Sequence, residues 1–184
     1  QRAAARSWAY VETSNTQFNE WLLRSAADVR VLTTATEYGQ YSYAGVPWLS
    51  TPFGRDGIIA ALEALWVNPD LAAGVLRFLA ANQATENDPN SDAQPGKILH
   101  EMRGGEMAAL DEHPFRRYYG SVDATPLFVL LAGEYYRATA DSDLLHDIWP
   151  NISAAIEWLD TYGDSNGDGF VDYARSRADG LLNQ

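Results

Sequence analysis

The chain contains no cysteine, which excludes disulfide bonds, zinc–thiolate sites and a thiol nucleophile. It is also poor in positive charge, because 13 lysine and arginine residues stand against 25 aspartate and glutamate residues and leave a formal net charge of −12. This balance disfavours nucleic acid and anionic membrane surfaces as partners, whereas it does not repel a neutral sugar polymer. No apolar run approaches the length of a membrane span.

The chain begins with glutamine rather than methionine, and its first residues lack the apolar core of a signal peptide. The natural N-terminus, and any targeting segment with it, is therefore expected to be missing. Together with the absent cysteines, these features favour a cytoplasmic protein. With 184 residues, of which 46% are hydrophobic and 21% charged, the chain is long and apolar enough for one globular segment with a real core.

Hydrophobic periodicity predicts a helical fold. Helices are expected to begin at Ser14 or Asn15, after Arg55 and Asp56, at Pro69, at Thr125 with Pro126 in the first turn, and near Pro150. Residues 36–53 read as a long aromatic-rich loop or a short hairpin, and residues 86–96 as a polar surface loop. Paired side by side, such helical hairpins bring segments 54–57 and 121–126 to one rim.

Segment 47–57 crowds turn formers, aromatic side chains and the adjacent pair Arg55 and Asp56 against the start of a helix. Asp56 alone is explained by an N-cap role, because a carboxylate accepts the unpaired amide protons there. Arg55 is not explained in this way, since a cation is disfavoured at a helix N-terminus. Flanked by glycines, the two side chains together can grip the hydroxyl groups of a polyol, Asp56 as acceptor and Arg55 as donor.

Further polar candidates follow in the second half of the chain. Glu101, Arg103 and Glu106 are interpreted either as groups of a loop near a sugar-binding rim or as an ion-pair cluster that orders a long connection. Asp123 is expected to face the rim, because Thr125 is already placed to cap the following helix. His100 and Glu101 resemble the start of a zinc-protease helix, but Gly104 stands where the second histidine is required, and we reject that interpretation.

Aromatic side chains near these segments can either stack on sugar rings or fill the core, and core packing is the commoner role. The candidates for stacking are Trp48, Phe53, Tyr118 and Tyr119. Trp48, which lies among turn formers, is the strongest of them.

A half-complete calcium loop begins at Asp164. Asp164, Asn166 and Asp168 occupy the first three oxygen-ligand positions of an EF-hand loop, with Gly169 at the sixth. The twelfth position, where a glutamate should close the cage, is Arg175. A turn held by Asx-type hydrogen bonds before a short strand at 170–173 is therefore favoured. Calcium is retained as a weak candidate, and no other cofactor is expected.

Trp48 followed by Phe53-Gly54-Arg55-Asp56-Gly57 resembles the first sugar-binding segment of bacterial amylo-alpha-1,6-glucosidase (glycogen-debranching-like) glycoside hydrolases, which are related to glucoamylases, trehalases and processing alpha-glucosidases. The likeness continues through segments 95–106, 121–128 and 164–173. The resemblance implies an all-α fold, an (α/α)6 toroid of six helical hairpins. Residues 1–184 would be a single segment, the N-terminal half of that catalytic domain.

The resemblance also implies an inverting hydrolysis of alpha-linked glucose, in which a carboxylic acid and a carboxylate about 6.5–9.5 Å apart flank the bond. Both catalytic groups are expected beyond Gln184, so no residue of this chain is assigned as acid or base. The substrate-binding residues that it implies are Trp48, Phe53, Arg55, Asp56, His100, Glu101, Arg103, Tyr119 and Asp123.

Two alternatives stay open at this point. A trehalase-type or glucosylglycerate-type hydrolase would use the same glucose pocket with a different leaving group, and a noncatalytic sugar-binding helical module would use it without chemistry. The expected partners are an oligosaccharide or polysaccharide and either the missing half of the toroid or a second copy of the chain. Nucleic acid and membranes are not expected partners.

Overall fold

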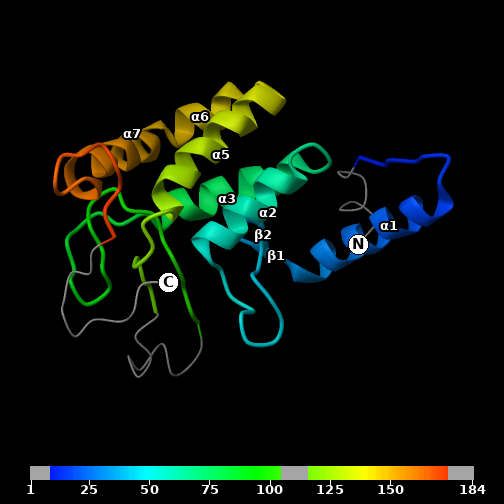
Figure 1. Ribbon diagram of the computed structural model, residues 1–184, viewed down its shortest axis with the longest axis horizontal. Helices are drawn as coiled ribbons and strands as arrows, with labels where there is room; N and C mark the ends of the chain where they lie inside the picture. The colour runs from blue at the N-terminus through cyan, green and yellow to red at the C-terminus, as the bar shows by residue number, and fades with distance from the viewer. Residues whose placement is uncertain (1–8, 105–115, 174–184) are drawn as a thin grey trace.

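The computed structural model describes residues 9–104 and 116–173, and these residues are mostly helical (Figure 1). Glu106, Arg175 and the stretch 180–184 lie outside the described residues. Within the described ranges, no helix combines the length and the apolar character needed to cross a bilayer. The elements in chain order are α1 (Thr16–Leu32), β1 (Thr33–Thr36), β2 (Gly39–Ser42), α2 (Gly54–Ala64), α3 (Pro69–Ala81), α5 (Ala124–Thr139), α6 (Ser142–Asp147), α7 (Trp149–Trp158) and the π-helical turn η2 (Leu159–Gly163).

All five helices expected from the sequence are present, and their start signals act as predicted in most cases. Asn15 caps α1, where its side chain accepts a hydrogen bond from the backbone N–H of Phe18. Pro69 lies in the first turn of α3, and Pro150 lies in the first turn of α7. The short helix α6 begins after Asp141, whose carboxylate accepts from two backbone N–H groups.

Two local predictions were wrong. Thr125 does not cap α5, because the helix begins one residue earlier, at Ala124, and the fully buried Thr125 hydroxyl instead accepts from the N–H of Ile98 at 3.0 Å. The expected strand at 170–173 is absent from this described stretch, which forms bends and irregular backbone with no partner strand.

The segment between α1 and α2 resolves into a hairpin followed by a loop. Strands β1 and β2 pair antiparallel, with Thr33 opposite Ser42, and they form the sheet of the described chain. The prediction of an all-helical chain is therefore correct for the main elements and incomplete for this hairpin. β2 lies against α3 so closely that a Cβ atom on Gly74 would stand 2.1 Å from the carbonyl oxygen of Gln40. Only glycine fits at that contact.

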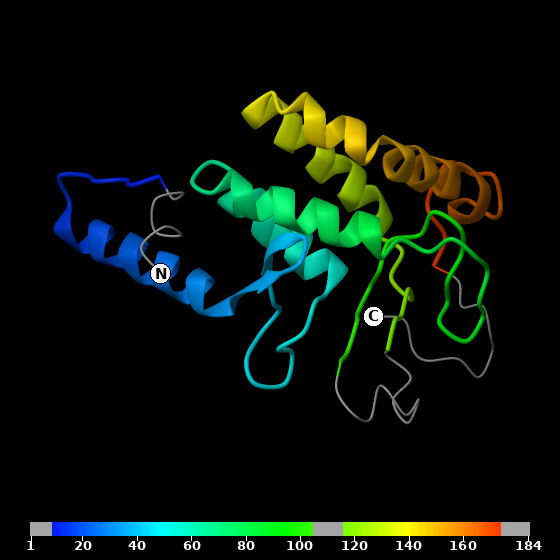
Figure 2. The ribbon, with the colours of Figure 1, turned by 180° about the vertical axis from the view of Figure 1, so that it is seen from behind.

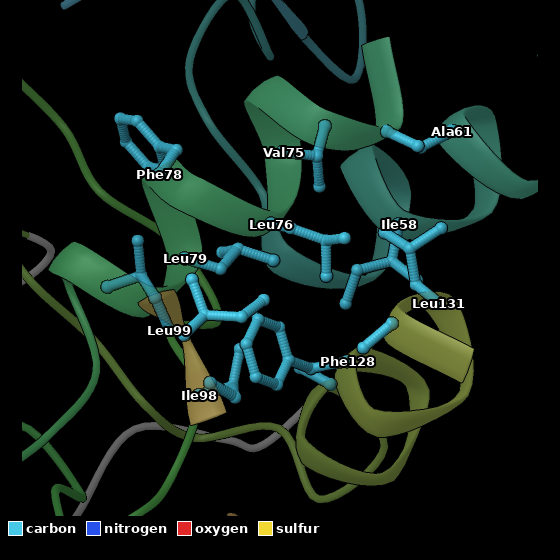
Figure 3. Packing of buried hydrophobic residues seen from close by; sticks show 14 of the residues in the cluster. Ile58, Ala61, Val75, Leu76, Phe78, Leu79, Ile98, Leu99, Phe128 and Leu131 are labelled. Atoms are coloured by element: carbon cyan, nitrogen blue, oxygen red, sulfur yellow. The ribbon is translucent and has the colours of Figure 1, made fainter. Parts of the chain in front are cut away.

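The core lies where α2, α3 and α5 meet (Figure 3). Ile58 of α2, Leu76 of α3 and Phe128 of α5 are each fully buried and point toward one another. Ile98 and Leu99 close the core from the extended segment that precedes α5. Helix α5 also packs against α7.

Helix α1 extends away from the other helices in both views (Figures 1 and 2). None of its residues is buried, although its sequence is amphipathic and includes Trp21 and Leu23, which are 63% and 58% exposed. Leu22, Ala26 and Val29 lie on the partly buried side of α1, where they line a cavity together with Ala60 and Ala64 of α2. The rest of α1 is exposed, whereas α2, α3 and α5 carry the core.

Candidate functional site

Helices α2 and α5 begin next to each other. The backbone N–H of Gly54, the first residue of α2, donates to the carbonyl of His100 at 2.8 Å. A Cβ atom on Gly54 would lie 1.9 Å from the carbonyl oxygen of Leu99 and 3.3 Å from the Cβ of Ala124, the first residue of α5. The glycine therefore allows the strand-like segment at 99–100 and the two helix N-termini to converge.

Neither of these two N-termini has a side-chain cap. Phe53 and Asp123 occupy the cap positions of α2 and α5, and neither makes a side-chain hydrogen bond to the first turn. Backbone N–H groups of a first helical turn have no partner within the helix. Two partly positive helix ends are thus presented at one place, without the usual serine, threonine or aspartate acceptor.

An ion pair joins the two helices. Arg55 Nη1 donates to Asp123 Oδ2 at 3.0 Å, and the two side chains are 36% and 38% exposed. An ion pair so open to solvent contributes about 0–1 kcal/mol to the free energy of unfolding, so it stabilises the contact between α2 and α5 only slightly. Its partial exposure leaves both groups able to contact a ligand. The other carboxylate oxygen, Asp123 Oδ1, is buried and has no hydrogen-bond partner.

Asp56 does not act as the N-cap that the sequence suggests. It is the third residue of α2, exposed to solvent, while the cap position belongs to Phe53. A carboxylate in a first turn is still favoured by the helix dipole. Because it makes no cap, its oxygens remain available beside Arg55.

His100, whose carbonyl accepts from Gly54 at the start of α2, is almost fully buried, with 3% of its surface exposed. Its ring meets the edges or faces of Phe53 and Tyr118 in T-shaped contacts, with centroids 5.8 and 5.7 Å away. Burial lowers the pKa of His100 below its usual value, and this effect outweighs the Glu101 carboxylate, which acts to raise that pKa. The imidazole is accordingly neutral at pH 7, and its Nδ1 has no hydrogen-bond partner.

Ser121 belongs to the same region and was not among the predicted residues. It is fully buried, two residues before Asp123, and its hydroxyl oxygen also has no partner. Buried polar groups without partners are rare and call for a water or a ligand group. Ser121 lies in segment 121–126, which the sequence places at the rim, but the sequence does not show that its side chain is buried without a partner.

Glu101 and Arg103 form an ion pair at the edge of the site, as the second of their two interpretations required. Glu101 is buried, and its backbone bridges Phe53 on one side and Tyr118 on the other. Arg103 is only partly exposed and leads toward the neighbouring loops. This pair orders the connection and borders the site at the same time, so the two interpretations are compatible.

Two predicted aromatic residues lie elsewhere. Tyr119 is part of the hydrophobic core, and its hydroxyl donates to the carbonyl of Asn82 at 2.8 Å, while burial raises its pKa. Trp48 lies in the loop between β2 and α2 and is 84% exposed. No ring contact or hydrogen bond of the described chain ties Trp48 to Arg55 or Asp123. The structure therefore brings together Phe53, Arg55, Asp56, His100, Glu101 and Asp123, with Arg103 at the edge.

The candidate calcium loop is held by its own hydrogen bonds. The carboxylate of Asp164 accepts from the backbone N–H groups of Gly167, Asp168 and Gly169, and that of Asp172 accepts from Ser165. These are the bonds of the Asx-type turn favoured above. Within the described ranges, no three histidine, cysteine, aspartate or glutamate side chains are grouped to hold a metal. Calcium binding stays a prediction.

The sequence matches no protein-family model and no curated protein. Function must therefore be argued from the residues and their geometry.

Proposed function

We propose that this chain carries the sugar-holding wall of a glycoside hydrolase that acts on alpha-linked glucose. The observation that carries the proposal is the meeting of two uncapped helix N-termini, α2 and α5, at the partly exposed pair Arg55 and Asp123. A sugar hydroxyl both donates and accepts, and this site offers carboxylates, a guanidinium and backbone N–H groups within one small area.

The charges of the site favour a neutral ligand over an ion. Asp56 and Asp123 would repel an anion, whereas Arg55 would repel a cation. The ring of Phe53, the residue before α2, is buried against His100, so it supports the polar groups of the site rather than facing a ligand.

The resemblance to amylo-alpha-1,6-glucosidases supports the glycoside hydrolase part of the proposal. It rests on the same residues, Phe53 to Gly57 and Ser121 to Pro126, that meet in the described site. The proposed fold is the corresponding half of an (α/α)6 toroid, which agrees with neighbouring helices that begin at one rim. The proposed mechanism is inverting, and Arg55, Asp56 and Asp123 hold the reacting sugar rather than transfer protons.

The test is direct binding of glucose, maltose, isomaltose and trehalose to the 184-residue chain by calorimetry or NMR. Loss of one charged hydrogen bond costs roughly 1.5–3 kcal/mol, so Asp56→Asn and Asp56→Ala should each weaken binding about tenfold to a hundredfold. In an enzyme that contains these residues, Asp56→Ala should lower kcat/KM for the same reason.

Asp70 provides a matched control, because it is also an exposed aspartate in the first turn of a helix, α3. Asp70→Asn should leave sugar binding unchanged. Two results together would show that Asp56 only stabilises the N-terminus of α2. Asp56→Asn would bind sugars like the unmodified chain, and Asp56→Ala would lower the free energy of unfolding only as much as Asp70→Ala does. If the unmodified chain binds no sugar, the proposed function is wrong.

A further inference from the structure

The chain contains a single lysine, Lys97, and this residue is buried. It lies at the end of the loop that follows α3, and 4% of its surface is exposed. Lysine is rarely buried without a charged partner, because its ammonium group loses hydration there. The placement of Lys97 therefore calls for a reason.

Lys97 has few partners for the three N–H donors of its ammonium group. Within the described residues, Nζ donates one hydrogen bond, to the carbonyl oxygen of Asp92 at 3.2 Å. From α7, the ring of Trp158 faces the ammonium, with its centroid 5.5 Å from Nζ. The carboxylate of Asp92 is the charged group that acts on Lys97, and the contact from α7 is uncharged. Neither the hydrogen bond nor the ring contact is a salt bridge, so the lost hydration is replaced only in part.

Burial therefore dominates the chemistry of this amine. It lowers the pKa of Lys97 from its ordinary value of 10.5 to about 8, and this effect outweighs the Asp92 carboxylate, which acts to raise that pKa. Relative to water, this position favours the uncharged amine over the ammonium.

Lys97 lies at the contact between its loop and α7. A Cβ atom on Gly96 would stand 2.1 Å from the carbonyl oxygen of Ala154 in α7, and the indole N–H of Trp158 donates to Gln94 Oε1 at 2.8 Å. In Figures 1 and 2 the loop lies beside the C-terminal half of α7. Residues 84–97, which we call the docked loop, are thus held against one helix with an ionisable group in the contact.

The docked loop also borders other parts of the fold. It lines a cavity of about 760 Å³ together with residues 102–104 and 116–119. Directly after Lys97, segment 98–101 is hydrogen-bonded to the first turns of α5 and α2. Movement of the docked loop away from α7 would therefore open the wall of this cavity and loosen the segment that leads to the site at the helix N-termini.

We propose that Lys97 is a pH-sensitive latch, which holds the docked loop against α7 when its amine is uncharged and releases the loop when the amine binds a proton. Release hydrates the ammonium, so the released form binds more protons than the docked form. Between the two pKa values, about 8 for the docked and 10.5 for the hydrated lysine, each pH unit should change the ratio of released to docked loop about tenfold. Docking is thus favoured as the pH rises through this range. This inference is independent of the proposed function.

The single lysine allows a direct test by NMR of the chain labelled with ¹³C at the lysine Cε. The signal of Lys97 should titrate with a midpoint at about pH 8 in the folded chain and about 10.5 in the urea-unfolded chain. A midpoint of about 10 or higher in the folded chain would overturn the inference, because the ammonium would then be hydrated in place.

Release of the docked loop is measured by hydrogen exchange of the Trp158 indole N–H, which is bonded to Gln94 while the loop is docked. Lys97→Met provides the uncharged reference, because its side chain has a similar length and cannot bind a proton. The exchange rate of the unmodified chain divided by that of Lys97→Met at the same pH should fall about tenfold from pH 8.5 to pH 9.5. Taking this ratio removes the effect of pH on the exchange chemistry itself.

Asn151→Ala is the matched control, since it removes hydrogen bonds from α7 to Ala80 and Gln83 without changing an ionisable group. Its exchange rate relative to the unmodified chain should be the same at both pH values. A ratio for Lys97→Met that does not change with pH would overturn the inference, because Lys97 would then not control release.

The backbone amide of Leu76, in the core, reports global unfolding in the same experiment. Its opening free energy should exceed that of the Trp158 indole. Equal opening free energies at the two positions would overturn the inference, because the loop would then leave α7 only when the whole chain unfolds.

Discussion

His100 is held between two aromatic rings and four charged side chains. Phe53 and Tyr118 pack against its ring, and the carboxylates of Glu101, Asp123 and Asp56 and the guanidinium of Arg55 act on its charge. Burial is the largest of these influences, and it lowers the pKa of the imidazole. His100 therefore supports the site as a neutral residue, and protonation of its ring is unfavourable in the folded chain.

This environment predicts a specific acid sensitivity. Because the pKa of His100 is lower in the folded chain than in the unfolded chain, the unfolded chain binds more protons once the pH falls below about 6.5. The free energy of unfolding should therefore be fully retained above that pH and decrease as the pH falls from 6.5 toward the lowered pKa. Urea denaturation at pH 7 and pH 5 should show a larger loss for the unmodified chain than for His100→Gln, whose side chain does not titrate.

His146 offers the control, because it is an exposed histidine at the end of α6. His146→Gln should keep the pH dependence of the unmodified chain. An equal loss of stability in the unmodified chain and in His100→Gln would contradict the prediction and would show that burial of His100 does not govern acid unfolding.

At the residue scale, the sequence indicated that segments 54–57 and 121–126 meet, as they do, but not which side chains pair. Arg55 and Asp123 are 68 positions apart, and only the packing of α2 against α5 makes them an ion pair. Asp56 was a plausible cap by type, yet α2 begins two residues before it, with Phe53 at the cap position. Ser121 lies in the predicted rim segment 121–126, but its burial without a partner could not be read from the sequence.

At the scale of elements, the backbones of α3 and the β-hairpin approach each other closely at Gly74. Gly74 lies in the interior of α3, where glycine normally costs stability, and its position faces β2. A Cβ atom there would meet the carbonyl oxygen of Gln40 at 2.1 Å and its amide nitrogen at 2.7 Å. Both are backbone atoms, which cannot move aside as the end of a side chain can.

Gly74→Ala should therefore lower the free energy of unfolding by about 1–3 kcal/mol, as other overpacked contacts do. Gly133 is the matched control, since it also lies within a helix, α5, and has no atom within 4 Å of an added Cβ. Gly133→Ala should raise stability by about 0.5–1 kcal/mol through helix propensity. Equal effects of the two substitutions in urea titrations would show that α3 and the hairpin do not pack as closely as described.

Helix boundaries were predictable where a local signal decides them and not where tertiary contacts do. Asn15 and Pro69 act within their own first turns, so their helices begin where expected. Threonine is a favoured cap residue, but the Thr125 hydroxyl accepts a hydrogen bond from the N–H of Ile98, which lies 27 positions away in the chain. The long loop at 36–53 contains a hairpin because its strands pair with each other, an alternative that the sequence left open.

At the scale of the whole molecule, the described helices bury apolar side chains in one core and leave other apolar side chains exposed to solvent. The core joins α2, α3 and α5, while α1 has no buried residue. A second apolar surface, a groove of about 650 Å³, runs along α5, α6 and α7 and includes Val129, Trp149 and Ile156. A half toroid would leave such surfaces for the rest of the ring, which is how the proposed fold accounts for them.

Exposed apolar surfaces of this extent predict self-association of the 184-residue chain. Trp21 and Leu23 of α1 are more than half exposed, and Val31 is 76% exposed. Contiguous apolar patches larger than a few hundred Å² are uncommon on soluble monomers, because water contact with them is unfavourable. In sedimentation velocity at micromolar concentration, the chain should therefore form species heavier than its monomer mass of 20.3 kDa.

Charged substitutions test which surface drives the association. Trp21→Glu combined with Val31→Lys keeps the net charge while removing two apolar side chains of α1, and it should shift the distribution toward monomer. Arg77→Ala, which alters an exposed polar position of α3, should leave the distribution unchanged. The prediction would be contradicted if the unmodified chain stayed monomeric at every concentration. That result would show that the exposed apolar surfaces of α1 and of the α5–α7 groove do not drive association.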